Sequence, residues 1–161
     1  MKHLTIALFL FLLTWPSVAG ATEPTNLPFD SCSGYFVSNR FEPDAAQSFL
    51  VSTNQKQFDK VFGLAVVMGD KSHRLPTDAF KSKMVLAVVK RAKAVWEFKV
   101  LGVTLDNGVV KLNYTTTSKK SESATFACPL VVSIPKGNYR AVEFVEDKQV
   151  VKKIGIGEGD R

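Results

Sequence analysis

The 161-residue chain is poor in the residue types that most often carry enzyme chemistry. It has two histidines, and only His73 lies beyond the first 21 residues. Its two cysteines, Cys32 and Cys128, lack the Cys-x-x-Cys spacing that lowers a thiol pKa, which disfavours a thiol-redox enzyme. A structural zinc site usually takes four Cys or His ligands, and the sequence offers no such set. We therefore expect no catalytic residues, no metal and no cofactor.

The chain also lacks a glycine-rich phosphate loop between a strand and a helix. Its one glycine cluster, Gly155–Gly159, lies near the end of the sequence with no helix after it. We expect residues 155–161 to form a flexible tail instead. One catalytic alternative stays open: a small hydrolase or ligand-processing enzyme in which His73 and an aspartate of the Gly69–Asp78 loop meet in a pocket.

The longest apolar segment lies at the N-terminus. Met1–His3 is short and basic, Leu4–Leu13 is almost entirely apolar, and Ala19–Ala21 fits the small-residue rule for signal peptidase. This apolar core is too short to span a bilayer comfortably. The sequence predicts a signal peptide over residues 1–21 and a single domain over residues 22–154. The protein is expected to be exported, to the periplasm or outside the cell, with no membrane span after cleavage.

Export bears on the two cysteines. In an oxidising compartment two cysteines pair by default, so the sequence predicts a disulfide between Cys32 and Cys128. Chain-entropy arguments assign a loop of that length about 4–5 kcal/mol of stabilisation. The alternative is two separate buried thiols.

Alternation of apolar and polar residues dominates the middle of the chain. Met84–Lys90 opens with six apolar residues in a row, which indicates a central strand. Val95–Thr117 contains two alternating segments joined by Asp106–Gly108, a strong signal for a tight hairpin. Ala124–Pro135 alternates again. We expect Thr115–Ser123, rich in Ser, Thr and Lys, to be a mobile loop.

One short helix is predicted over Asn54–Gly63. Asn54 and Gln57 have the spacing of a capping box, and Gly63 supplies the stop. Three apolar residues of this segment fall on one face, which should pack on a sheet. The predicted fold class is α+β and mostly β: an antiparallel sheet or sandwich of about seven strands with one short helix packed on it.

Basic residues are concentrated in the middle of the chain. Residues 81–120 carry nine Lys or Arg and two Asp or Glu, whereas the rest of the chain beyond residue 21 is nearly balanced. This cluster predicts a surface for a protein or an anionic envelope component. The alternative is that lysines on edge strands only block unwanted pairing. The candidate binding residues are Lys90, Arg91, Lys93, Trp96 and Lys99.

Nucleic acid is not expected as a partner. The export signal separates the chain from most nucleic acid, and the sequence lacks an exposed alternation of aromatic and basic residues.

The order of elements in Phe58–Glu146 resembles the C-terminal domain family of the PrcB-type protease-complex subunit. The resemblance rests on a phenylalanine-bearing helix, a Leu-Pro loop leading to a phenylalanine, the MVLAVV strand, the hairpin, CPLVVSIPK and AVEFVE. It implies a β-rich module of exported bacterial proteins that is associated with protein binding, and it does not imply any catalytic residue. The family's glycine-rich turn is replaced here by Lys90–Trp96. The sequence thus predicts an exported, non-catalytic binding module.

Overall fold

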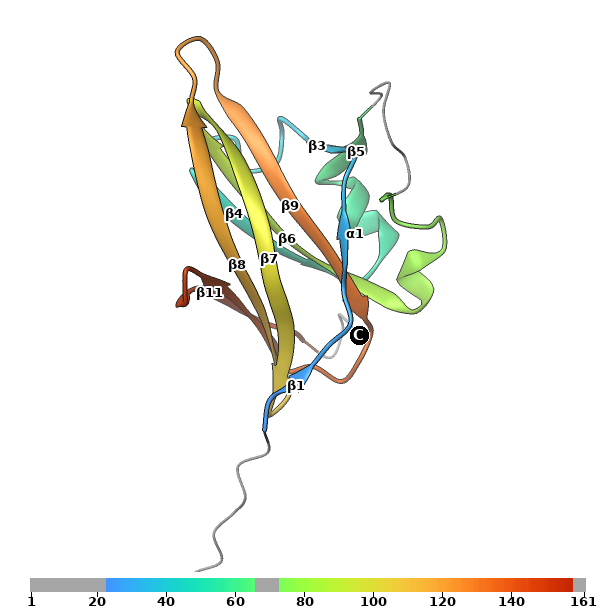
Figure 1. Ribbon diagram of the computed structural model, residues 1–161. Helices are drawn as coiled ribbons and strands as arrows, with labels where there is room; N and C mark the ends of the chain where they lie inside the picture. The colour runs from blue at the N-terminus through green and yellow to red at the C-terminus, as the bar shows by residue number, and fades with distance from the viewer. Residues whose placement is uncertain (1–22, 66–72, 158–161) are drawn as a thin grey trace, which may run out of the picture.

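A sandwich of two β-sheets forms the body of the protein in the computed structural model, which describes residues 23–65 and 73–157 (Figure 1). Strands make up most of these residues, as the fold-class prediction requires. The elements in chain order are β1 Thr25–Asn26, β2 Asp30–Cys32, β3 Tyr35–Val37, β4 Gln47–Ser52, α1 Gln55–Asp59, β5 Phe62–Leu64, the 3-10 turn η1 Ala79–Lys81, β6 Lys83–Ala92, β7 Ala94–Asp106, β8 Val109–Lys120, β9 Phe126–Pro135, β10 Ala141–Glu146 and β11 Gln149–Gly155.

The strands form three sheets. The five-stranded sheet has the order β1-β7-β8-β10-β11, the four-stranded sheet β2-β9-β6-β4, and the two-stranded sheet β3-β5. Every pair is antiparallel except β8 and β10, which run parallel. Figure 1 shows the five-stranded sheet on one side, the four-stranded sheet in the middle, and α1 with the two-stranded sheet beyond it.

The main core lies between the two large sheets. Alternate residues of β8, Val110, Leu112 and Tyr114, are fully buried there, as the alternation predicts. From the other sheet, Phe49 of β4 meets Phe144 of β10 with ring centroids 5.0 Å apart. The two sheets are therefore held in register by interdigitated apolar side chains.

A second core covers the outer face of the four-stranded sheet. Val85, Ala87 and Val89 of β6 pack there against Phe58 of α1 and Phe62 of β5. Strand β6 is thus buried on both faces, which explains why its sequence is an unbroken apolar run.

The predicted hairpin between β7 and β8 and the hairpin between β10 and β11 both have left-handed residues at their turns. Asn107 and Gly108 have φ values of 48° and 76° between β7 and β8. Asp147 and Lys148 have φ values of 49° and 69° between β10 and β11. These are the conformations that two-residue hairpin turns require.

The helix is shorter than predicted, and Asn54 caps it as expected, whereas the second half of the predicted capping box differs. Asn54 accepts a hydrogen bond from the Gln57 N–H at 3.0 Å. The Gln57 side chain reaches back to the backbone N–H of Thr53, not of Asn54, at 3.0 Å. The α-helix ends at Asp59, and Phe62 already belongs to β5, where it pairs with Val37.

The prediction of a mobile loop over Thr115–Ser123 is wrong for most of its length. Strand β8 continues through Lys120, and Thr115, Thr117 and Lys119 pair with β7. Threonine is β-branched and suits a half-exposed strand, so its polarity does not indicate a loop here.

The predicted disulfide is contradicted, because both cysteines are free. Cys32 lies opposite Val131 on β9, whose side chain belongs to the outer core. Cys128 lies opposite Lys90, which faces the five-stranded sheet. Directly opposed residues share a face, so the two sulfurs lie on opposite faces of the sheet, about 10 Å apart along β9. The alternative of two separate thiols describes this structure.

Alkylation gives a direct check on this arrangement. The protein is purified without reducing agent, denatured, and then treated with an alkylating reagent. Cys32 and Cys128 are both expected to react, so that the intact mass increases by two labels. Reducing agent should leave the unfolding midpoint unchanged, because no cross-link is broken. If reducing agent instead lowered the free energy of unfolding by about 4–5 kcal/mol, the protein would contain the disulfide. That result would contradict the registers of β2 and β9.

No helix of the described residues is long and apolar enough to cross a membrane. At the C-terminal end, β11 extends to Gly155, one residue into the segment predicted as a flexible tail. Residues 158–161 of that tail lie outside the described residues, as does the predicted signal peptide.

Candidate functional site

The structure does not bring the five predicted binding residues together on one surface. Lys90 points between the two large sheets, where its ammonium group pairs with the Glu146 carboxylate. It also donates a hydrogen bond to Thr116 Oγ1 at 3.2 Å and lies 4.3 Å from the centre of the Trp96 ring. Lys90 is only 9% exposed. Its charge is therefore satisfied inside the fold and is not offered to a partner.

Arg91 likewise binds the protein's own chain. Its guanidinium group donates to the Phe41 carbonyl at 2.6 Å, to Ser48 Oγ at 2.8 Å and to the Ala45 carbonyl at 3.3 Å. These bonds hold the segment that leads into β4 against the end of β6. The guanidinium group of Arg91 thus has a structural role within the protein.

The other three residues divide between inside and outside. Trp96 is half-buried below Lys90, and its backbone N–H lies 3.4 Å from Cys128 Sγ. Lys93 and Lys99 are exposed, on the turn before β7 and on the outer face of β7. The sequence signal, a count of charges, did not distinguish buried from exposed lysines. The five residues do not form one surface.

A buried polar network surrounds Glu146 between the sheets. Besides Lys90, it accepts hydrogen bonds from Thr116 Oγ1 at 2.7 Å, Gln47 Nε2 at 3.2 Å and Tyr114 Oη at 3.3 Å. Burial alone would raise the pKa of Glu146, but the hydrogen bonds from Lys90, Thr116 and Gln47 and the Lys90 charge outweigh it and lower the pKa. Burial, followed by the Glu146 charge, raises the pKa of Tyr114. The network connects β4 and β6 of one sheet to β8 and β10 of the other, and this structural role accounts for its polar residues.

The lowered pKa of Glu146 predicts an acid-sensitive contribution to stability. Its ionised form is favoured by folding, so the contribution is complete above the ordinary glutamate pKa and is lost as pH falls through the lowered pKa of the folded state. We expect the urea midpoint of the wild type to fall more steeply over that acid range than that of Glu146→Gln. Parallel pH profiles for the two proteins would contradict this assignment.

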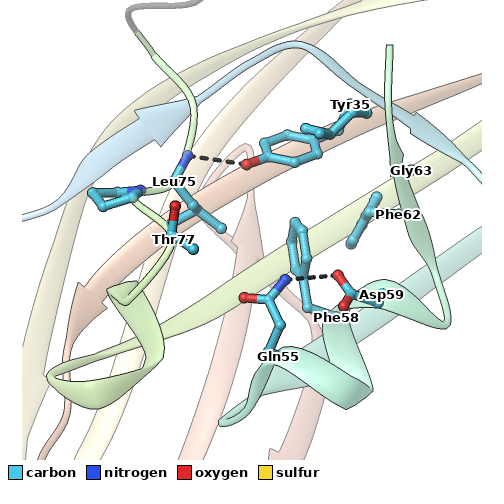
Figure 2. Close-up of a pocket in the computed structure, with 10 residues that line it drawn as sticks. Tyr35, Gln55, Phe58, Asp59, Phe62, Gly63, Leu75 and Thr77 are labelled. Atoms are coloured by element: carbon cyan, nitrogen blue, oxygen red, sulfur yellow. Dashed lines mark hydrogen bonds between the residues drawn. The ribbon is translucent and has the colours of Figure 1, made fainter.

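An apolar groove opens on the far side of the four-stranded sheet, between α1, the two-stranded sheet and the loop before η1 (Figure 2). It has a volume of about 490 Å³, within the range typical of ligand-binding pockets. Its lining residues are Tyr35, Gln55, Phe58, Asp59, Phe62, Gly63, Leu64, Leu75, Pro76 and Thr77.

Aromatic packing fixes the floor of the groove. The Phe58 ring lies 5.1 Å from the Tyr35 ring in an edge arrangement and 4.9 Å from the Phe62 ring. Phe80 supports Phe58 from η1 at 5.7 Å. Phe58 and Phe62 are 2% and 3% exposed, so their positions are set by the core and not by a ligand.

Tyr35 connects the loop at Leu75, which forms one wall of the groove, to the aromatic floor. Its hydroxyl oxygen accepts the Leu75 N–H at 3.0 Å, shown as a dashed line in Figure 2. A tyrosine hydroxyl also carries a proton to donate. On the rim, Gln55 donates to the Asp59 carboxylate at 2.7 Å across one turn of α1. The groove therefore joins an apolar floor to a few polar groups at its edge.

The two-stranded sheet carries one exposed apolar side chain at the groove and another on its opposite face. Leu64 forms part of its wall and is 55% exposed. Phe36, 53% exposed, lies on the opposite face of the two-stranded sheet, over Gly63. A Cβ atom added to Gly63 would lie 2.3 Å from the Phe36 ring, so glycine allows this ring to lie flat on the strand.

His73 lines a smaller cavity of about 240 Å³ with Asp30, Cys32 and Lys83. Asp30 forms a 2.6 Å ion pair with Lys83, and this hydrogen bond lowers the pKa of Asp30. Burial raises the pKa of Cys32, which disfavours the reactive thiolate. The cavity thus contains a paired carboxylate and a protonated thiol.

The hydrolase alternative requires an aspartate from the loop that carries His73. Asp78 does not line the His73 cavity and lies 3.8 Å from Lys81 with its side chain 67% exposed. Asp70 lies outside the described residues. Among the described residues, no group of three or more His, Cys, Asp or Glu side chains could hold a metal ion. The catalytic alternative stays a prediction.

The sequence did not indicate this groove as a site. Its lining comes from four separate segments, and only the phenylalanine-bearing helix and the Leu75-Pro76 loop were singled out, as parts of the family resemblance. No local signal in the sequence marks the groove, because its lining side chains come together only in the tertiary structure.

The fold and the groove together define a class: a two-sheet β-sandwich with a helix-flanked apolar groove on its outer layer. No family model, no curated protein and no solved structure matches the chain. The resemblance to the PrcB-type C-terminal domain family therefore stays a prediction.

Proposed function

We propose that the protein is an exported, non-catalytic binding module that holds a partner protein by an apolar anchor side chain seated in the groove. The observation that carries the proposal is the rigid aromatic floor of Phe58 and Phe62 beneath an opening beside the exposed Leu64. Binding sites commonly combine an apolar pocket with a few placed polar groups. Here those groups are the Tyr35 hydroxyl and the rim side chains of α1.

The charge at the rim favours a polypeptide over an anion. Among the described residues that line the groove, Asp59 is the one carboxylate and none is a lysine or an arginine. An anionic envelope component would meet repulsion from Asp59 and no compensating cation there. We infer a partner segment that carries an aromatic or branched aliphatic anchor, with a neutral or basic residue beside it.

Peptide selection tests this proposal. Peptides selected for binding to the protein from a random library are expected to share a large apolar anchor. Leu64→Ser should weaken their binding about tenfold, because part of the apolar contact area is lost. Dissociation constants measured by calorimetry give the comparison.

Leu101→Ser is the matched control, because Leu101 is also 55% exposed but lies on β7 in the five-stranded sheet. It should bind the selected peptides as the wild type does. Equal losses in both variants, or selected peptides without an apolar anchor, would overturn the assignment of the groove.

A further inference from the structure

The two large sheets do not end together at one side of the sandwich. Strand β4, the last strand of the four-stranded sheet, lies over β10, as the contacts of Phe49 with Phe144 and of Gln47 with Glu146 show. Strand β11 lies one strand further out in the five-stranded sheet. Among the described strands, only β10 makes extensive contact with β11, and Figure 1 shows β11 on the left of the molecule, the side away from α1 and the two-stranded sheet. We call this place the step.

One wall of the step is the free edge of β4. On the other edge of β4, the Ala46 carbonyl accepts the Arg91 N–H at 2.8 Å and begins the ladder with β6. Backbone groups of an antiparallel strand alternate between its two edges. Gln47, Phe49 and Val51 therefore direct their N–H and C=O groups to the edge that no described strand occupies.

Apolar side chains line the inside corner of the step. Phe49 and Val51 point toward the main core and pack against it, yet both remain only partly buried. Ile154 of β11 lies opposite the buried Val142 and is also partly buried. An additional strand beside β4 would cover these three side chains with its own inward residues.

The floor of the step is basic. Lys152 lies opposite Phe144 on β10, so its side chain is on the inner face of β11, and it is exposed. None of the ion pairs found among the described residues involves Lys152. At the adjacent turn Lys148 and Asp147 are both exposed and their charges offset, so Lys152 supplies the net positive charge of the step. Two copies meeting at this step would bring their Lys152 side chains together, and like charges directly opposed destabilise a sheet.

We propose that the step accepts an extended, acidic segment of a partner protein as a fifth strand of the four-stranded sheet. The free backbone groups of β4 supply the ladder, the half-buried Phe49, Val51 and Ile154 supply apolar contact, and Lys152 selects a carboxylate. This site lies on a different part of the molecule from the groove and does not depend on it.

Two synthetic peptides of about eight residues test the proposal on the full mature chain: the alternate residues that face the step are valine except for one, which is glutamate in the first peptide and lysine in the second, and the residues between them are threonine. The glutamate peptide is expected to shift the amide resonances of β4 and β11 and to bind at least about threefold more tightly than the lysine peptide. Lys152→Glu should reverse that preference.

Lys153→Glu is the matched control, because it makes the same charge change on the opposite face of β11, where Lys153 pairs with Glu143 at 2.8 Å. It should leave the preference for the glutamate peptide in place. The proposal is overturned if neither peptide shifts β4 resonances, if Lys153→Glu reverses the preference as well, or if the chain dimerises through β4. Leu64→Ser should not affect this binding, which separates the step from the groove.

Discussion

Replacing Glu146 by alanine is expected to lower the free energy of unfolding by about 3–5 kcal/mol, because it leaves the Lys90 ammonium group buried without its partner. The side chains of Lys90 and Glu146 are only 11% and 13% exposed, so water cannot replace the lost contact in place. Thr116, Gln47 and Tyr114 would each lose a hydrogen-bond acceptor at the same time. Equilibrium urea unfolding measures the effect.

Two companion variants separate burial from charge. Glu143 lies on β10, as Glu146 does, and pairs with Lys153 of β11. Because Lys153 is 57% exposed, Glu143→Ala should lower the free energy of unfolding by less than about 1 kcal/mol. The double variant Lys90→Met, Glu146→Leu should recover most of the stability lost in Glu146→Ala, because no charge is then left unpaired. Equal losses for Glu146→Ala and Glu143→Ala would contradict the burial of the pair between the sheets.

Phe144→Ala is expected to destabilise the protein by about 3–5 kcal/mol, because it opens a cavity in the main core. Phe144 is fully buried on β10, the strand that pairs in parallel with β8 and supports Phe49 across the sandwich. Its removal therefore loosens both sheets at the position where they contact each other. The unfolding midpoint in urea and its slope give the measurement.

Phe36→Ala makes the same chemical change at an exposed position. Phe36 is 53% exposed and rests on Gly63, so its loss should cost no more than about 1 kcal/mol. A loss in Phe144→Ala that is no larger than the loss in Phe36→Ala would contradict the burial of Phe144 between the two large sheets.

Local signals in the sequence predicted the parts of the fold that depend on local interactions. The apolar run of β6, the Asp106–Gly108 turn and the Asn54 cap each act within a few residues, and all three are found in the structure. Seven strands are six or more residues long, in agreement with the predicted number of about seven. The four shorter strands have too few residues to show an alternation.

The parts that failed depend on contacts between distant segments. The pairing of Cys32 with Cys128 was predicted because the protein was expected to be exported. Whether the two cysteines share a face of the sheet depends on the strand register, which their spacing along the sequence does not reveal. The parallel pairing of β8 with β10 was likewise invisible, because the intervening β9 belongs to the other sheet.

The candidate site could be predicted only in part, because it too depends on contacts between residues that are distant in the sequence. Lys90 and Arg91 belong to a basic run in the sequence, but their partners Glu146 and Phe41 lie about 50 residues away on either side and bring both charges inside the fold. The groove is assembled from Tyr35, α1, β5 and the loop at Leu75, which only the tertiary structure brings together. Composition thus indicated binding but not the surface that performs it.

The measurement that tests the binding proposal most directly is a set of intermolecular nuclear Overhauser effects between a selected peptide and the aromatic rings of the protein. The account predicts contacts from the peptide's anchor side chain to the ring protons of Phe58 and Phe62, which form the floor of the groove. Contacts that instead involve Leu101, or the exposed Val150 and Val151 of β11, with none to Phe58 and Phe62, would contradict it.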